Sequence, residues 1–207
     1  MGNIRKTDSK KRILKAFIAI LNTDGFNKMT VSKITSLAHI NRGTFYLNYI
    51  DKFDLLEEIE QEIFTKIKTI LLEKETIDII FSDEKILAVI SYLQSNAALI
   101  TALINSDLKN SIQEQLANLL KNIFTENNAN INNPKIAQPY ASNIIFGSIS
   151  TIFITWIKNN MQESPEELLN IINSYRKLTP IDIFHKLLSN FIFLNSYNFM
   201  CESILYL

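Results

Sequence analysis

The chain has 207 residues, of which 47% are hydrophobic, and its 21 basic and 21 acidic residues leave no net charge. The single cysteine, Cys201, excludes an internal disulfide and a cysteine-ligated metal site, which is typical of a reducing cytoplasm. Four glycines and four prolines are few helix breakers for this length, so the composition predicts an all-α protein with a sizeable core.

The charges are unevenly distributed along the chain. Residues 1–56 contain 10 Lys or Arg and 4 Asp or Glu, a net +6, whereas residues 57–207 contain 11 and 17, a net −6. A basic first part on an acidic remainder is expected of a protein whose N-terminal domain faces a polyanion. The alternative is chance clustering in a Lys-rich chain.

The first predicted helix begins near Thr7–Ser9 and runs to about Thr23, with no apolar run that would indicate a signal peptide before it. Its apolar positions recur with helical spacing and define the expected buried face: Ile13, Phe17, Ile20 and Leu21. Gly25 follows, and it can adopt the left-handed conformation in which helices often end.

Two short helices and one long helix are predicted next. Thr30 caps the second helix, whose expected buried positions are Val31, Ile34, Leu37 and Ala38. A tight turn at His39–Ile40 leads into a third helix from about Asn41 to Leu47. Asp51 caps a fourth helix that continues to about residue 74, with its apolar face at Leu55, Ile59, Ile63, Ile67 and Ile70/Leu71.

The remainder shows further helical patterns, at 76–81, 83–95, 97–105, 108–126 and 140–160, with a loop at 127–133. Ser164–Pro165 and Thr179–Pro180 each place a capping residue before proline and therefore predict two more helix starts. The most apolar runs are 144–157, which is too short to span a bilayer, and 187–207, which polar residues interrupt. We therefore expect buried helices and no membrane partner.

Residues 29–56 have the organisation that reading of the DNA major groove requires. Two short helices meet at a tight turn, and the second begins with small, polar and basic residues. A recognition helix enters the groove by its N-terminal end, so Gly43 and Thr44 allow close approach while Asn41 and Arg42 offer hydrogen-bonding groups.

This stretch resembles the DNA-binding domain of the TetR family, T-[VL]-x-x-[IL]-A-x-x-A-G-[VI]-[ST]-x-G-[ST]-[FL]-Y-x-[HY]-F-x-x-K-x-x-L. The matching residues are Thr30, Val31, Ile34, Ala38, Ile40, Gly43, Thr44, Phe45, Tyr46, Lys52 and Leu55. The resemblance implies a helix-turn-helix domain over 1–56 in a cytoplasmic bacterial transcriptional regulator that binds double-stranded operator DNA.

The resemblance also implies roles for individual residues. Phosphate contacts are expected from Thr30, Tyr46 and Lys52, and base or neighbouring phosphate contacts from Asn41, Arg42 and Thr44. Tyr46 could instead be a core residue, but Phe45 already fits that role. Further candidates are Lys33, Gly43 and Asn48. For Lys10, Lys11 and Lys33, general attraction to phosphates and a simple solvated surface are both open.

Four residues depart from the family pattern. His39 stands where glycine is usual, and histidine tolerates positive φ better than most residues do. Asn48–Tyr49 replaces the usual His/Tyr–Phe, and Phe53 replaces an acidic residue, which weakens the N-terminal charge of the fourth helix.

A second resemblance covers residues 146–169, which are similar to the C-terminal domain of a TetR subgroup from low-GC Gram-positive bacteria with a W-I…S-P-E-E motif. It implies that Gly147 and Trp156 are packing residues, and that 57–207 form a regulatory domain whose last family helices dimerise as a four-helix bundle. The alternative is an unrelated apolar helix followed by a well-capped one.

These features predict a homodimeric repressor that a small apolar effector releases from DNA. The expected residues of the effector pocket are Tyr92, Phe124, Phe153 and Trp156. One alternative is a TetR-like regulator without a pocket, controlled by a protein partner or acting as an activator. Another is a protein that compacts DNA without sequence preference.

An enzyme is not expected, because the sequence has no phosphate loop, zinc-ligand spacing or nucleophile motif, and no cofactor or metal is implied. The two histidines, His39 and His185, lie far apart in the sequence, and His185 fits a buried helix. The acidic residues of 57–62 are expected to be solvated.

Overall fold

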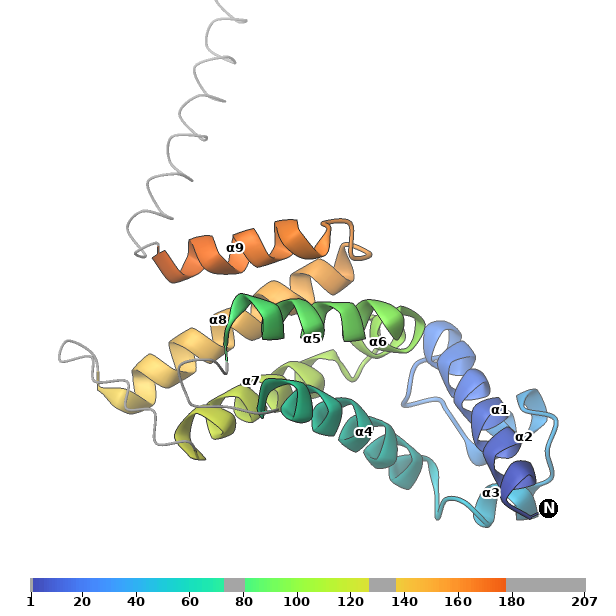
Figure 1. The fold of residues 1–207 in the computed structure, drawn as a ribbon. Helices are drawn as coiled ribbons and strands as arrows, with labels where there is room; N and C mark the ends of the chain where they lie inside the picture. Colours follow the sequence, from blue (N-terminus) through green and yellow to red (C-terminus); the bar gives the residue numbers. More distant parts are fainter. Residues whose placement is uncertain (1, 73–80, 127–136, 178–207) are drawn as a thin grey trace, which may run out of the picture. The chain divides into compact units, whose positions relative to one another are not determined.

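The computed structural model describes residues 2–72, 81–126 and 137–177, and its contacts divide the chain into two compact units after Glu166 (Figure 1). Over these residues it is helical, without a β-strand. The helices are α1 (Gly2–Thr23), α2 (Val31–Leu37), α3 (Arg42–Tyr46), α4 (Lys52–Leu72), α5 (Asp83–Ser95), α6 (Ala97–Asn105), α7 (Lys109–Glu126), α8 (Gln138–Lys158) and α9 (Pro165–Lys177). The predicted features at 73–80, 127–133 and 179–207, including His185, lie outside the described residues.

The predicted boundaries agree closely for α5 and α6 and differ at two other helices. The helix α1 begins at Gly2 rather than near Thr7–Ser9, because no proline or other interior breaker separates these residues from the rest of the helix. The helix α8 spans Gln138–Lys158 rather than 140–160, a shift of two residues at the predicted length of 21. By length and composition alone Tyr140–Lys158 could cross a membrane, and 44% of that window is buried within the protein.

The helices α1–α3 form the head, with a small core of their own. The predicted face of α1 is buried at all four positions, and Ile34 and Phe45 are fully buried beside it. Leu37 is 49% exposed, so its predicted place in the core is wrong. Thr35 is buried instead, and this costs little because its hydroxyl donates to the carbonyl of Ser32 at 3.2 Å.

The helix α4 leads from the head into the body, which consists of α4–α8. Its buried face is the predicted one: Leu55, Ile59, Ile63, Ile67 and Leu71. In the body, α7 and α8 pack along each other, α4 packs on α5 and α7, and α6 contacts α1 of the head as well as α7 and α8 (Figure 1). The head is therefore joined to the body through the chain at α4 and through space by contacts with α4, α6 and the α6–α7 turn.

The second unit begins within α9. This helix starts at Pro165, directly after Ser164, as the Ser–Pro pattern predicts. Arg176 and Lys177 occupy its last turn, where positive charge complements the helix dipole.

Candidate nucleic-acid interface

The two short helices of the head are capped by side chains at their N-termini. Thr30 has extended backbone angles, and its Oγ1 accepts the N–H of Lys33 at 3.2 Å, which confirms the predicted cap. Asn41 caps α3 rather than being its first residue, since its Oδ1 accepts the N–H of Thr44 at 2.7 Å and the Thr44 hydroxyl at 2.9 Å. One face of Asn41 is thus occupied within the protein.

The turn between α2 and α3 depends on His39. Its φ is +50°, in the left-handed region where the family pattern has glycine. The N–H of His39 bonds to the carbonyl of Ser36 at 3.2 Å, and the N–H of Ile40 bonds to that of Thr35 at 3.0 Å. The structure therefore confirms that the turn forms with histidine at this position.

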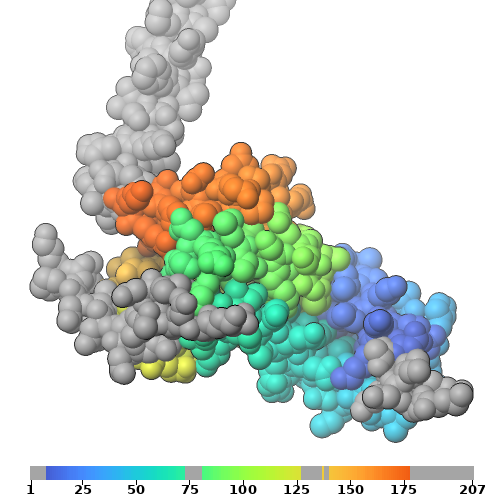
Figure 2. Space-filling model, viewed as in Figure 1, coloured from blue at the N-terminus to red at the C-terminus, as the bar shows by residue number. Residues whose placement is uncertain are grey.

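The neighbouring aromatic residues Phe45 and Tyr46 of α3 differ in exposure, although their rings meet edge to face with centroids 5.7 Å apart. Phe45 is completely buried, whereas Tyr46 is 57% exposed, so the assignment of Phe45 to the core and Tyr46 to the surface is confirmed. Two apolar side chains beside Tyr46, Leu47 and Ile50, are largely exposed as well, and they are not among the residues predicted to contact DNA. The head is the blue-to-cyan part of the space-filling view in Figure 2.

Arg42 and Gly43 lie on the exposed side of α3. The Nη2 of Arg42 donates to the hydroxyl of Ser32 at 3.1 Å, which links α3 to α2. The other N–H groups of the planar guanidinium can donate to further acceptors. A Cβ added to Gly43 would meet only Asn41 Oδ1, at an ordinary contact distance of 3.4 Å. Packing inside the head therefore does not require glycine here.

Two lysines of the head are paired with carboxylates of the protein. Lys33 donates to Asp24 Oδ2 at 2.6 Å, and this hydrogen bond and the charge of Lys33 lower the pKa of Asp24. Lys10 donates to both carboxylate oxygens of Glu58, at 2.7 and 2.9 Å. These ammonium groups face acceptors of the protein itself as well as solvent.

Glu58 also accepts the Tyr49 hydroxyl at 3.0 Å, so Lys10, Glu58 and Tyr49 tie α1 to α4. Burial, followed by the charge of Glu58 and its hydrogen bond, raises the pKa of Tyr49 above its usual range. Glu58 is exposed, as expected for the acidic residues of 57–62, and it holds two partners in addition. This network joins positions 9 and 48 residues apart, and no sequence signal marks it.

Lys52 and Asn48 turn toward the protein. The ammonium group of Lys52 donates to the carbonyl oxygens of Phe26 at 2.9 Å and Asn27 at 3.2 Å. The predicted phosphate contact of Lys52 therefore has to use its backbone N–H or a rearranged side chain. Asn48 Nδ2 donates to the carbonyl of Thr44 at 2.8 Å, while its Oδ1 is buried and has no hydrogen-bond partner in the described part of the chain.

The four aromatic residues predicted to line an effector pocket do not share one environment. Trp156 is 2% exposed, and its indole N–H donates to the carbonyl of Glu163 at 3.0 Å. Phe153 is also buried, whereas Phe124 is half-buried against Phe146, with ring centroids 5.6 Å apart. Tyr92 is half-buried on α5, and burial, followed by the charge of Glu62, raises its pKa.

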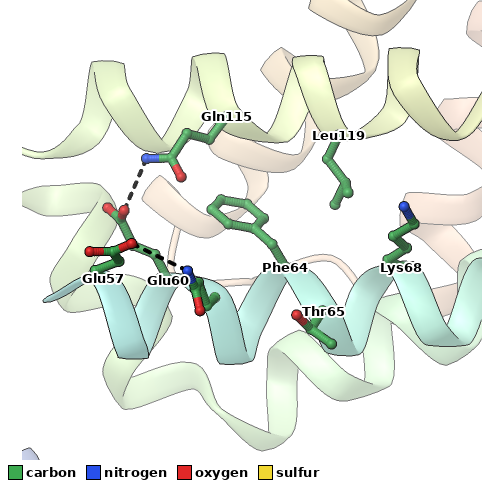
Figure 3. A pocket seen from close by; sticks show the side chains of 8 residues that line it. Glu57, Glu60, Phe64, Thr65, Lys68, Gln115 and Leu119 are labelled. Carbon is green, nitrogen blue, oxygen red and sulfur yellow. Dashed lines mark hydrogen bonds between the residues drawn. The ribbon is translucent and has the colours of Figure 1, made fainter. Parts of the chain in front are cut away.

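A groove of about 390 Å³ lies elsewhere, between α4 and α7 (Figure 3). Phe64 and Leu119 provide its apolar side chains, and none of the four predicted residues lines it. At one end Gln115 donates to Glu60 at 3.1 Å, so Glu60 too is more than a solvated surface residue. Burial raises the pKa of Glu60, the nearby charge of Glu57 adds to this, and the bond from Gln115 opposes it.

The described geometry is that of a helix-turn-helix head on a helical body, which defines a class of DNA-binding proteins. The family model for bacterial regulatory proteins of the tetR family matches residues 13–59, and a model for a transcriptional regulator C-terminal region matches residues 82–177. Together they cover the head and the segment from α5 to α9. The chain belongs to the TetR family of transcriptional regulators.

Individual proteins show the same relationship. The fatty acid metabolism regulator protein of Bacillus subtilis (strain 168) is 28% identical over 205 residues, covering 88% of this chain and 99% of that protein. Among solved structures, a TetR transcriptional regulator from Streptococcus agalactiae 2603V has a TM-score of 0.61 at 21% identity, covering 83% of this chain and 97% of that one. The regulator FadR from Bacillus subtilis in complex with stearoyl-CoA has a TM-score of 0.50 at 24% identity, covering 79% and 94%. The structural similarities concern the fold.

Proposed function

We propose that this protein is a homodimeric transcriptional repressor in the cytoplasm that binds a two-fold operator through α2 and α3 and is released by a small apolar effector. The observation that carries the proposal is the exposed edge of α3. There Arg42 and Tyr46 flank a glycine, Gly43, that the packing of the head does not require. A position without a side chain between two polar groups suits close approach of the backbone to DNA.

On this proposal Arg42 reads base edges, because its guanidinium group matches the acceptors of guanine in the major groove. Tyr46 and Thr30 hold phosphates on either side, and Thr44 lies close enough to the entering end of α3 to assist. Asn41 contributes mainly by capping α3, since its Oδ1 already accepts two hydrogen bonds. Lys33, Asn48 and Lys52 support the head from within.

The class of effector is proposed from the relatives. The Bacillus subtilis relative is named for fatty acid metabolism, and the Bacillus subtilis FadR structure was solved in complex with stearoyl-CoA. We therefore propose a long-chain acyl-CoA, whose acyl chain is a small apolar effector in the sense expected from the sequence. The W-I…S-P-E-E motif at Trp156 and 164–167 supports a place in the Gram-positive subgroup.

The dimer is proposed to form through α8. Tyr140 is 69% exposed and Ile144 is 54% exposed, and a Cβ added to Gly147 would meet nothing within 4 Å. Apolar side chains next to a small residue allow a second helix to pack closely. A two-fold operator needs two heads, so dimerisation and DNA binding depend on each other.

The experiment is an in vitro selection of operator sequences with the full-length protein, followed by retardation assays. Arg42→Ala should weaken operator binding at least about 30-fold, because each of two heads loses a contact worth about 1–3 kcal/mol. Arg176→Ala removes the same side chain from α9 and serves as the control. Circular dichroism and sedimentation should show Arg42→Ala folded and dimeric.

The effector is tested on the same complex. Stearoyl-CoA should release the operator, while free coenzyme A at equal concentration should not. Undiminished specific binding by Arg42→Ala would overturn the assignment of the head. Release by neither compound, with operator binding intact, would overturn the acyl-CoA effector while leaving the DNA-binding function in place.

A further inference from the structure

One turn of the head is held from two sides by charged side chains. Phe26 and Asn27 lie between α1 and α2. Asp107, from the turn between α6 and α7, accepts the N–H of Phe26 through Oδ1 at 2.8 Å and the N–H of Asn27 through Oδ2 at 2.9 Å. Lys52 donates to the carbonyl oxygens of the same two residues. The α6–α7 turn and the start of α4 therefore both hydrogen-bond to the peptide groups of Phe26 and Asn27.

The two hydrogen bonds that Asp107 accepts are directional. Both oxygens of one carboxylate meet two successive N–H groups, and hydrogen bonds to a charged acceptor are about twice as strong as neutral ones. Gly25, with φ at +77°, turns the chain out of α1 just before this pair. Burial opposes the charge of Asp107, but its bonds to Phe26 and Asn27 and the charge of Lys52 hold the pKa of Asp107 below its usual range.

Other contacts through space also hold the head. The helix α1 packs on α6, Glu58 of α4 accepts hydrogen bonds from Lys10 and Tyr49, and Lys52 of α4 donates to the α1–α2 turn. Apolar contacts such as those of α1 with α6 are non-directional and tolerate sliding, whereas a two-point hydrogen bond fixes both position and rotation. The hydrogen bonds to Glu58 and Lys52 attach the head to the start of α4 only. The two bonds of Asp107 attach it in addition to the α6–α7 turn, so its orientation follows that turn as well.

We propose that Asp107 is the positioning residue that fixes the orientation of the DNA-binding head on the body and carries movement of the α6–α7 turn to α2 and α3. This inference rests on the proposed function as an operator-binding dimer. In such a dimer the orientation of each head sets the separation of the two recognition helices, and half-sites repeat about every 34–36 Å along DNA.

The decisive variant is Asp107→Asn. The asparagine side chain keeps one acceptor oxygen but presents an NH2 group to the second backbone N–H. One of the two hydrogen bonds is therefore lost with little change in side-chain volume. Asp107→Glu keeps the charge and both oxygens and should restore most of the wild-type behaviour. Glu114→Gln removes a carboxylate from the exposed side of nearby α7 and is the matched control. Thermal unfolding followed by circular dichroism establishes that each variant is folded.

The first measurement needs no DNA. Spin labels are placed on the full chain at Asn22→Cys in α1 and Ser91→Cys in α5, with Cys201→Ser, and labelled protein is diluted with unlabelled protein so that only distances within one chain contribute. In Asp107→Asn the distribution of distances between the two labels should be at least about twofold wider, because the head is no longer held by both hydrogen bonds. The control should match the wild type. An unchanged width in folded Asp107→Asn would overturn the proposal.

The second measurement uses selected operators whose central spacer is lengthened or shortened by one base pair. This moves a half-site by about 3.4 Å and rotates it by about 35°. The wild type should bind the altered spacers at least about tenfold more weakly, and Asp107→Asn only about threefold more weakly, because its heads can adapt. Equal discrimination by both would overturn the positioning role. If no operator can be selected even with wild-type protein, the proposed function fails, and the distance measurement still decides the role of Asp107.

Discussion

At the scale of single residues, the head is shaped by a few local hydrogen bonds and two left-handed positions. Thr30 and Asn41 start the two short helices, and Asp51 starts α4 by accepting the N–H groups of Phe53 and Asp54 at 2.8 and 2.9 Å. Gly25 and His39 supply positive φ at the turns before and after α2. These features are local in sequence, which is why the sequence alone predicted all of them except the cap at Asn41, a residue it assigned to DNA contact.

Glu60 offers a prediction about stability and pH. Its folded-state pKa is raised, mainly by burial, so the ionised side chain destabilises the fold at pH values above that pKa. The cost disappears below the ordinary pKa of glutamate, where Glu60 is protonated in both the folded and the unfolded state. Glu60→Gln should therefore raise the unfolding temperature near about pH 8, with the gain vanishing near about pH 4.

The measurement is thermal unfolding by circular dichroism across that range, with Glu114→Gln as the control on the facing helix. Gln115 can still hydrogen-bond to an amide oxygen at position 60. A variant that is less stable than the wild type at both pH values would show that the carboxylate stabilises the groove between α4 and α7.

At the scale of helices, α8 gives a prediction about assembly. Ile144 is exposed in the protomer, so Ile144→Asp should leave the protomer folded. In a two-fold interface the new charges lie on both partners, and unfavourable charge contacts of this kind cost several kcal/mol, so the dimer should weaken by about 100-fold or more. Sedimentation velocity measures the change, and operator binding should fall with it.

Ser91→Asp places the same charge on the exposed side of α5 and should remain dimeric. If Ile144→Asp sediments as the wild-type dimer does, α8 does not form the interface through this face.

The helices also show where prediction from sequence stops. The spacing of apolar residues correctly predicted the buried faces of α1 and α4, because helical spacing places these residues on one side of the helix regardless of what packs against it. Leu37 was misplaced because α2 has only seven residues, too few for periodicity to decide between adjacent positions. The inward turn of Lys52 depends on Phe26 and Asn27, and the role of Asp107 spans 80 residues or more, so neither has a local signal.

At the scale of the whole molecule, the basic head and acidic body predict how DNA binding responds to salt. Operator affinity should fall by on the order of 100-fold between about 50 and 200 mM salt if some four phosphates are neutralised per dimer. Several basic side chains of the head are paired internally, including Lys10 and Lys33, so the slope should be smaller than the charge of +6 on residues 1–56 suggests.

Titrations of selected and random DNA across a salt series measure this slope. The selected operator should keep an advantage at every salt concentration, because base contacts do not depend on counterion release. Equal affinity for both DNAs at all salt concentrations would instead favour a protein that compacts DNA without sequence preference.

The burial of Trp156 has a practical consequence for such work. It is the only tryptophan in the chain, and its indole ring is enclosed in the body with its N–H bonded to the carbonyl of Glu163. Its emission should therefore be blue-shifted and poorly quenched by iodide in the folded protein. The protein thus carries a built-in optical reporter, so that rearrangement around α8 can be followed in real time without attaching a dye.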